Sequence, residues 1–309
     1  LGIKEGGDRW NDNSDEAARA EAQWRKDSAA RMKAQFDRAK LSPQAQVNYD
    51  IWALEAERAE VSLANRIYRP PFYSRLYSAH SQLPDFLINT HTVADVTDLK
   101  NYIARLKGMP AVLDRALERT QASQQAGINP PRFQLETIIE GSRKLTSGAP
   151  FGDGPDAALW ADVKAKTAAL VAGGTLPQAE ADALLEEAKA AIIALQPAYG
   201  RVIAWAEASL PTAPSGKVGA LTLPGGLDYY ERELKLVTTT NMTAAEIHAT
   251  GRAEVARIEA EQDALAKQAG FADRHAFYAE RKRLYPPRPY DDAARKEYLD
   301  TANAFVTRT

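Results

Sequence analysis

The strongest constraint on the fold is a helix with complete start and stop signals at residues 243–270. Thr243 is a favoured N-cap residue, and Glu246 three positions later completes a capping box. Gly270 followed by Phe271 is typical of a left-handed C-cap with its hydrophobic follower. Between them, apolar residues and one glycine recur at steps of three, four or seven, at Ile247, Gly251, Val255, Ile258 and Leu265. This pattern predicts a long amphipathic helix.

Similar signals recur along the chain. Ser14 before two acids and Ser42 before Pro43 are both favoured helix starts. Helical periodicity breaks at Gly108 and resumes after Pro110, and Pro197 is expected to kink or split a later helix. The predicted helices cover residues 14–36, 42–69, 96–108, 110–117, 133–145, 157–171, 177–209, 243–270, 273–284 and 291–306.

Strand signals are scarce. Residues 217–222 and 234–239 could each form a short strand, but neither alternates cleanly between apolar and polar residues. We therefore predict an all-α fold, a large antiparallel multi-helix array with at most minor β-structure. A proline-rich stretch before Gly225 suggests a boundary, which gives an N-terminal helical region, 1–212, and a loop with a helical hairpin, 213–309. One continuous domain is the alternative.

Composition narrows the possible partners. The chain has 309 residues, of which 45% are hydrophobic and 26% charged, as in an ordinary folded globular protein. A net charge of -2 gives no electrostatic reason to expect nucleic acid or an anionic membrane. No apolar run approaches the ~20 residues of a membrane helix, so no transmembrane segment is expected. The absence of cysteine excludes disulfides, thiolate metal sites and cysteine catalysis.

The residues contain no recognisable catalytic motif. None of the four histidines, His80, His91, His248 and His275, is followed by Glu, and no two lie four positions apart. A zinc-peptidase helix requires both features. No Gly-x-Ser-x-Gly nucleophile turn is present either. We therefore predict neither a metal ligand nor a catalytic residue in this chain, and the motifs do not decide whether it is an enzyme.

Five residues are candidates for substrate contact. His248 lies in the first turns of the capped helix, where the positive helix end favours a neutral ring. Tyr229 and Tyr230 could donate phenol hydrogens to a substrate oxygen. Arg69 and Tyr73 belong to an aromatic and proline-rich segment, 68–77, whose composition suits a peptide-binding surface. The alternatives are structural: His248 would tie down a neighbouring turn, and the tyrosines and the segment would simply pack.

Several stretches resemble one bacterial family in the order in which they occur. They are LGIKEGGDRW at 1–10, LSPQAQVNYDIW at 41–52, AGINPPR at 126–132, LPGG at 223–226, and TAAEIH at 243–248 with the following Gly251. Together they span most of the chain. The sequence resembles the N-terminal half of the bacterial domain-of-unknown-function family 885, whose members include lipoproteins and relatives of gluzincin-like zinc metallopeptidases.

The resemblance implies a function that the residues alone do not. It implies a helical region that forms one wall and the roof of the substrate cleft of an envelope zinc-dependent peptidase and binds a peptide substrate. Zinc and the general-base glutamate would come from a C-terminal catalytic part beyond residue 309. It also implies a periplasmic or cell-envelope location, with lipid anchoring through a leader before Leu1. The alternative is a non-enzymatic helical binding or scaffold module of the envelope that binds a protein partner.

Overall fold

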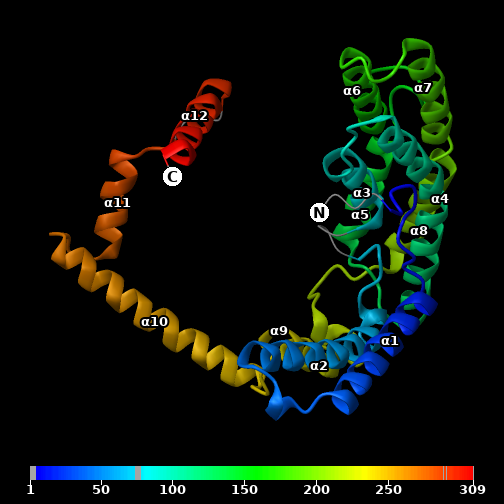
Figure 1. The fold of residues 1–309 in the computed structure, drawn as a ribbon. Helices are drawn as coiled ribbons and strands as arrows, with labels where there is room; N and C mark the ends of the chain where they lie inside the picture. Colours follow the sequence, from blue (N-terminus) through cyan, green and yellow to red (C-terminus); the bar gives the residue numbers. More distant parts are fainter. Residues whose placement is uncertain (1–4, 74–77, 288, 290, 309) are drawn as a thin grey trace. The chain divides into compact units, whose positions relative to one another are not determined.

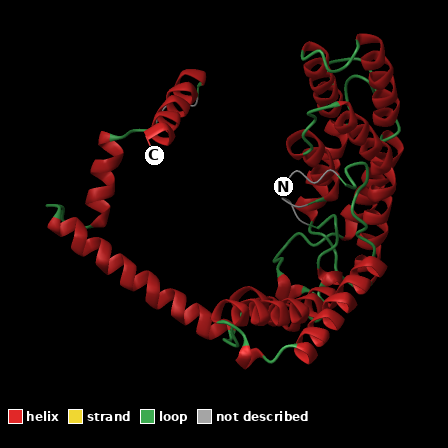
Figure 2. Ribbon diagram, in the orientation of Figure 1, coloured by secondary structure: helices red, strands yellow, loops and turns green. Residues whose placement is uncertain are grey.

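A computed structural model describes residues 5–73, 78–287, 289 and 291–308. These residues are predominantly helical and contain no strand, as Figure 2 shows, so the predicted all-α fold is confirmed. The chain divides into two compact units, Leu1–Thr239 and Thr240–Thr309. Residues 213–239, which the sequence grouped with the C-terminal part, make their contacts within the first unit.

The first unit begins with a helical hairpin of α1 (Asp15–Gln35) and α2 (Pro43–Ala64), visible in Figure 1. Both starts follow the prediction, because the Ser14 hydroxyl accepts from the Ala17 amide and the Ser42 hydroxyl from the Ala45 amide. Short α3 (Ala79–Asp85) and the π-turn Phe86–Thr90 follow. The remaining helices are α4 (Val96–Gln125), α5 (Arg132–Leu145), α6 (Ala158–Ala172), α7 (Gln178–Ile193), α8 (Gln196–Ser209) and α9 (Gly226–Thr238).

Helix α4 is the central element of this unit. It packs against α3, α6, α7 and α8, while α5 packs against α8. Its buried positions form one continuous apolar face: Leu99, Tyr102, Ile103, Leu106, Met109, Leu113 and Leu117. The predicted break at Gly108 is wrong, because this face continues through Gly108 and Pro110 and its burial outweighs their poor helix propensity. Gly108 faces Trp10, and an added Cβ would lie 3.4 Å from that ring, in van der Waals contact.

Two further predictions meet different outcomes. Pro197 does separate α7 from α8, which begins at Gln196. The two possible strands are wrong, because residues 220–222 form a 3-10 turn and residues 234–238 lie in α9. Leu227, Tyr230 and Leu234 recur at helical spacing, and Thr239 in the left-handed region ends that helix. The sequence pattern of α9 was therefore present but was obscured by the β-favouring threonines.

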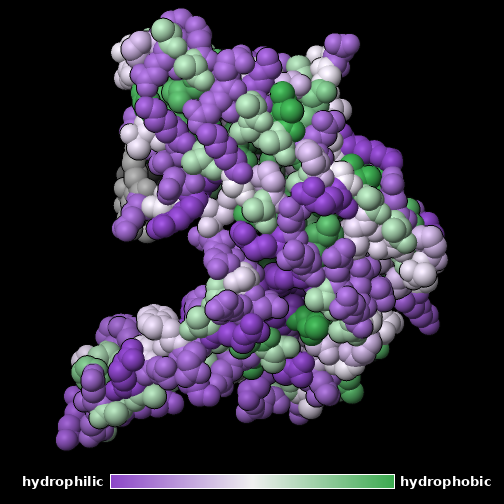
Figure 3. Space-filling view, turned by 90° about the vertical axis from the view of Figure 1, so that its right-hand side faces the viewer, coloured by the Kyte–Doolittle hydropathy of each residue, from purple (hydrophilic) through white to green (hydrophobic). Residues whose placement is uncertain are grey.

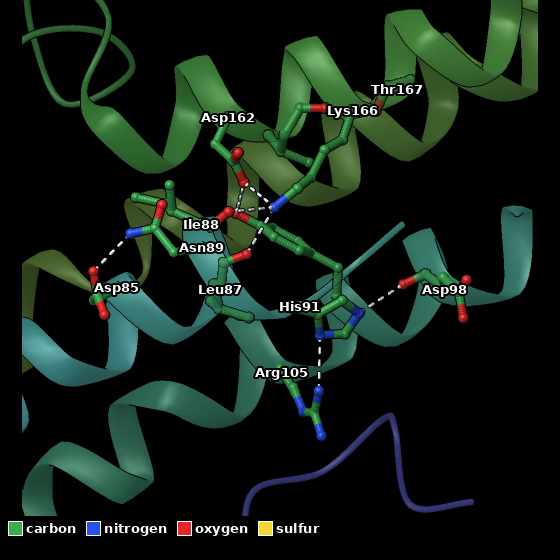
Figure 4. Close-up of polar contacts among 12 residues, drawn as sticks. Asp85, Leu87, Ile88, Asn89, His91, Asp98, Arg105, Asp162, Lys166 and Thr167 are labelled. Carbon is green, nitrogen blue, oxygen red and sulfur yellow. Dashed lines mark hydrogen bonds and ion pairs between the residues drawn. The ribbon is translucent and has the colours of Figure 1, made fainter. Parts of the chain in front are cut away.

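A partly buried cation attaches α6 to the π-turn. Figure 4 shows that the Lys166 ammonium donates to the backbone oxygens of Leu87 at 2.8 Å and Ile88 at 3.1 Å. It also contacts the Asp162 carboxylate at 2.8 Å, which accepts a further hydrogen bond from Tyr102 at 2.9 Å. The lysine thus satisfies carbonyls that the irregular turn leaves outside regular helix bonding.

His91 at the end of the π-turn has a defined tautomer. Arg105 donates to Nδ1 at 2.8 Å, so Nδ1 is an acceptor, and Nε2 donates to the Asp98 carbonyl at 3.1 Å (Figure 4). Burial lowers the pKa of His91, and the positive charge of Arg105 lowers it further, against the Asp98 hydrogen bond. The ring is therefore held in the neutral form.

The second unit contains α10 (Ala244–Gln268), α11 (Arg274–Leu284) and α12 (Asp292–Arg308). The predicted capping box of α10 is confirmed, with the Glu246 carboxylate accepting from the Thr243 amide at 2.8 Å. Gly270 has φ +87° and the Phe271 amide donates to the Ala266 oxygen, as the predicted C-cap requires. The apolar stripe is largely exposed, and Val255, Ile258 and Leu265 each have 43% or more of their surface accessible.

The face drawn in Figure 3 is mostly hydrophilic, with hydrophobic residues in small scattered groups. Across the described parts of the chain, every helix is too short or too polar to cross a bilayer.

Replacement of Lys166 should weaken the first unit. In Lys166→Met the aliphatic stem is kept, but the two carbonyls and the Asp162 carboxylate lose their cation, and we expect the free energy of unfolding to fall by about 3 kcal/mol. Urea denaturation followed by circular dichroism measures this. Lys164→Met is the matched control on the same helix: Lys164 is 40% exposed and pairs with Asp156, and we expect a change below about 1 kcal/mol. Equal losses in the two variants would contradict the assigned role of Lys166.

Candidate functional site

The first unit contains a cleft of about 830 Å³. Its walls come from six parts of the chain: the segment before α1, the segment that follows α2, helix α3, one side of α4, the start of α5, and the segment that leads into α9 together with the first turn of that helix. This volume lies in the range of ligand sites, ~300–1,000 Å³. The cleft is therefore the candidate functional site.

Three of the five predicted contact residues line this cleft. They are Arg69, Tyr73 and Tyr229. Tyr230, the next residue on α9, is 40% exposed and does not line it. His248 is exposed on α10 in the second unit, where it lines a shallow surface hollow with Ile247 and Gly251. Residues 74–77 of the predicted peptide-binding segment lie outside the described residues.

Two stacked tyrosines form one wall of the cleft. The rings of Tyr68 and Tyr229 are nearly parallel, with centroids 4.4 Å apart and an interplanar angle of 13°. The Tyr68 hydroxyl also donates to the Pro224 oxygen at 2.9 Å. These contacts fasten the Pro-Gly-Gly turn and the start of α9 to the segment after α2. Sequence analysis did not single out Tyr68, because only the fold shows that it faces Tyr229.

The Pro-Gly-Gly turn requires its glycines for two reasons. Gly225 has φ +63°, in the region that favours glycine. A Cβ on Gly225 would also lie 2.7 Å from the Tyr68 hydroxyl, and one on Gly226 would lie 1.8 Å from the Ala220 oxygen. The turn therefore packs directly on the backbone of Ala220 and Leu221, and Ala220 lines the cleft.

Arg69 is held at the cleft by an acidic partner. Its guanidinium forms an ion pair with Glu233 of α9, and the other Glu233 oxygen accepts from the buried Asn65 amide at 2.5 Å. Burial lowers the pKa of Arg69, but a hydrogen bond to the Tyr229 hydroxyl and the Glu233 charge outweigh this, and the net shift is upward. Arg69 is thus a cation that contacts both Glu233 and the Tyr229 hydroxyl.

Tyr73 contributes a neutral phenol. Burial raises its pKa, and the neighbouring Tyr229 raises it further. A neutral phenol can donate a hydrogen bond to an oxygen of a bound molecule without carrying charge. Such a group suits a peptide carbonyl.

The described residues do not form a zinc site. Among them, no group of three or more His, Asp or Glu residues is arranged to hold a metal ion. His80 is buried with Nδ1 2.9 Å from the Ser78 hydroxyl, and both ring nitrogens of His91 are engaged within the fold. These histidines therefore do not fit zinc ligation, and the expectation that zinc belongs to further polypeptide stays a prediction.

Comparisons with known proteins identify the relatives of this chain. The family described as bacterial protein of unknown function (DUF885) matches residues 1–309. A crystal structure from Colwellia psychrerythraea, described as a putative lipoprotein, has the same fold, with a TM-score of 0.73 and 17% sequence identity. The match covers 98% of this chain and 52% of that one, so the chain spans about half of that protein's length. Comparison with curated proteins gives no match.

Substitution of Gly226 should disturb the cleft wall. The Cβ of Gly226→Ala would overlap the Ala220 oxygen and displace the turn, and we expect a loss of about 1–3 kcal/mol in the free energy of unfolding. Thermal unfolding of the variant measures this loss. Gly216→Ala is the control, because nothing lies within 4 Å of the added Cβ. A Gly226→Ala protein as stable as this control would show that the turn tolerates a side chain.

His80, buried in α3 beside the cleft, should make stability depend on pH. Burial lowers the pKa of His80 to about 4, below its unfolded value of about 6.5, so the unfolded chain binds the proton first. Its stabilising contribution is complete above pH ~6.5 and falls by about 3 kcal/mol as the pH drops to ~4. Urea denaturation across this range should show a smaller decline in His80→Gln. Parallel curves for the two proteins would rule out this coupling.

Proposed function

The chain belongs to the DUF885 family of bacterial proteins, and from this premise we propose that it forms one wall and the roof of the substrate cleft of an envelope zinc-dependent peptidase. The observation that carries the proposal is the cleft of about 830 Å³, in which Arg69, Tyr73 and Tyr229 converge. Its size suits a few residues of an extended peptide.

The contribution of these residues is binding and orientation. Tyr73, as a neutral donor, would hold a peptide carbonyl, and the stacked rings of Tyr68 and Tyr229 would support apolar side chains. Arg69 would keep Tyr229 in place and offer a charge at the rim. In this proposal zinc and the general-base glutamate would come from a C-terminal catalytic part, as the resemblance to the family implies. No chemical step is assigned to the residues of this chain.

A location in the periplasm or cell envelope, with lipid anchoring, is part of the same proposal. It is supported by the similarity to a protein described as a putative lipoprotein. A peptidase anchored there would meet peptides outside the cytoplasm.

A non-enzymatic envelope module that binds a protein partner is the alternative. Its discriminating test is peptide hydrolysis by the full-length natural protein with and without a zinc chelator. Chelator-sensitive hydrolysis would support the peptidase, whereas peptide binding without hydrolysis in either condition would favour the binding module.

Removal of aromatic rings from the cleft should weaken peptide binding. In the chelator-treated full-length protein, we expect Tyr73→Ala and Tyr229→Ala to raise the Kd of short apolar peptides about tenfold each, because each removes a large contact surface. Isothermal titration calorimetry measures the change. Tyr230→Ala is the matched control, since its ring lies outside the cleft on the same helix. The same Kd in all three variants would sink the proposal that peptides bind here.

A further inference from the structure

The charges of the cleft have one sign. Three arginines line it, Arg69 from the segment after α2 and Arg115 and Arg119 from α4. Among the described lining residues there is no Asp or Glu. Arg115 and Arg119 lie four residues apart and therefore project from the same side of the helix. A ligand that fills the cleft would therefore be next to arginines and would not be next to a carboxylate of the lining.

Two of these arginines have acidic neighbours. Arg69 is paired with Glu233. The Asp15 carboxylate lies 2.5 Å from Nε of Arg66 and 3.4 Å from Nε of Arg119, so its closer partner lies outside the cleft lining. Arg119 is therefore only partly neutralised.

Arg115 is the most available of the three cations. It is exposed and makes no hydrogen bond or ion pair with the described part of the chain. The charge of Arg115 acts on Asp12 without a hydrogen bond or ion pair between them: it is the smallest of the causes that lower the pKa of Asp12, after hydrogen bonds from Ser14, whose amide donates to the Asp12 carboxylate. For Arg119, burial lowers the pKa, and repulsion from Arg66 lowers it further despite Asp15. Both arginines would gain from an anion in the cleft, because an arginine pairs with both oxygens of a carboxylate.

The rest of the lining is apolar or neutral. Leu83, Val112, Phe133 and Leu223 form apolar walls, and the amides of Asn11 and Asn13 offer donors and acceptors. This combination suits a molecule that has a carboxylate, an adjacent amide and an apolar side chain. The C-terminal residue of a peptide has all three.

We propose that the cleft binds the C-terminal end of a peptide, with its α-carboxylate paired to Arg115 and Arg119 and its last side chain against the apolar wall. This inference rests on the proposed peptide-binding function and adds the end of the chain that is recognised. It requires a free terminal carboxylate, which an internal peptide segment does not provide.

The test compares three ligands on the chelator-treated full-length protein by isothermal titration calorimetry. They are an acetylated apolar tripeptide that ends in phenylalanine, the same peptide with a C-terminal amide, and a medium-chain fatty acid. We expect the free acid to bind about tenfold more tightly than the amide, because only the acid forms the charge-assisted pair. The fatty acid, which lacks the amide groups, should bind more weakly than the acid peptide.

Variants locate the effect. Arg115→Gln should reduce the preference for the acid to about twofold or less, and the double variant Arg115→Gln with Arg119→Gln should abolish it. Arg143→Gln removes the same charge from an exposed arginine of α5 that pairs with Glu207 outside the cleft. This control should keep the full preference. Because Arg115 has no partner in the described fold, its replacement is not expected to unfold the protein.

Each contrary outcome has a distinct meaning. Equal binding of acid and amide would overturn the C-terminal inference and leave peptide binding intact. A fatty acid that binds as tightly as the acid peptide would overturn it in favour of a simple carboxylate site. No binding of either peptide would overturn both this inference and the proposed function.

Discussion

Helix α4 has a buried apolar side and a side that carries arginines at the cleft. Burial of the apolar side fixes the orientation of the helix and therefore the position of the arginines. Leu99, Leu106 and Leu113 are fully buried, and α7 and α8 pack on this helix. Burial of each such side chain stabilises the fold by about 1.5–3 kcal/mol. A helix fixed in this way cannot rotate without exposing its core residues. Arg115 and Arg119 are therefore held at the cleft by hydrophobic packing on the opposite side of the same helix.

The cleft depends on segments that are far apart in the sequence. Tyr68 and Tyr229 stack although 160 residues separate them in the numbering, and Arg69 pairs with Glu233 of the same distant helix. The glycine turn before α9 permits this close approach, because a side chain at Gly226 would meet the Ala220 backbone. Along this wall, the residues that we propose for peptide binding are thus also the residues that hold the segments together. A change in the turn should alter both stability and the shape of the cleft.

Local signals in the sequence were sufficient for much of the fold. Caps at Ser14, Ser42 and Thr243 act over a few residues, so they could be recognised without tertiary information. The continuity of α4 through Pro110 could not, because it depends on partners that bury both sides of the interruption. The residues of the candidate site divide in the same way into those that local sequence indicates and those that only the packed structure brings together. Aromatic and charged residues could be selected by type, but the approach of Tyr68 to Tyr229 and the location of Arg115 on the cleft side of α4 are properties of the packed structure.

In the second unit, helix caps are present but few side chains are buried. Among the described residues from 240 onward, Ala266 is the only buried one, while α10 has a capping box and ion pairs such as Arg257 with Glu261. The cap and the ion pairs within the helix act over one or two turns, and each contributes only ~0.2–2 kcal/mol. In folded proteins most helix stability comes from tertiary packing of an apolar face. Among the described residues from 240 onward, caps and short-range ion pairs therefore contribute a larger share of helix stability than they do in the first unit, where neighbouring helices bury α4.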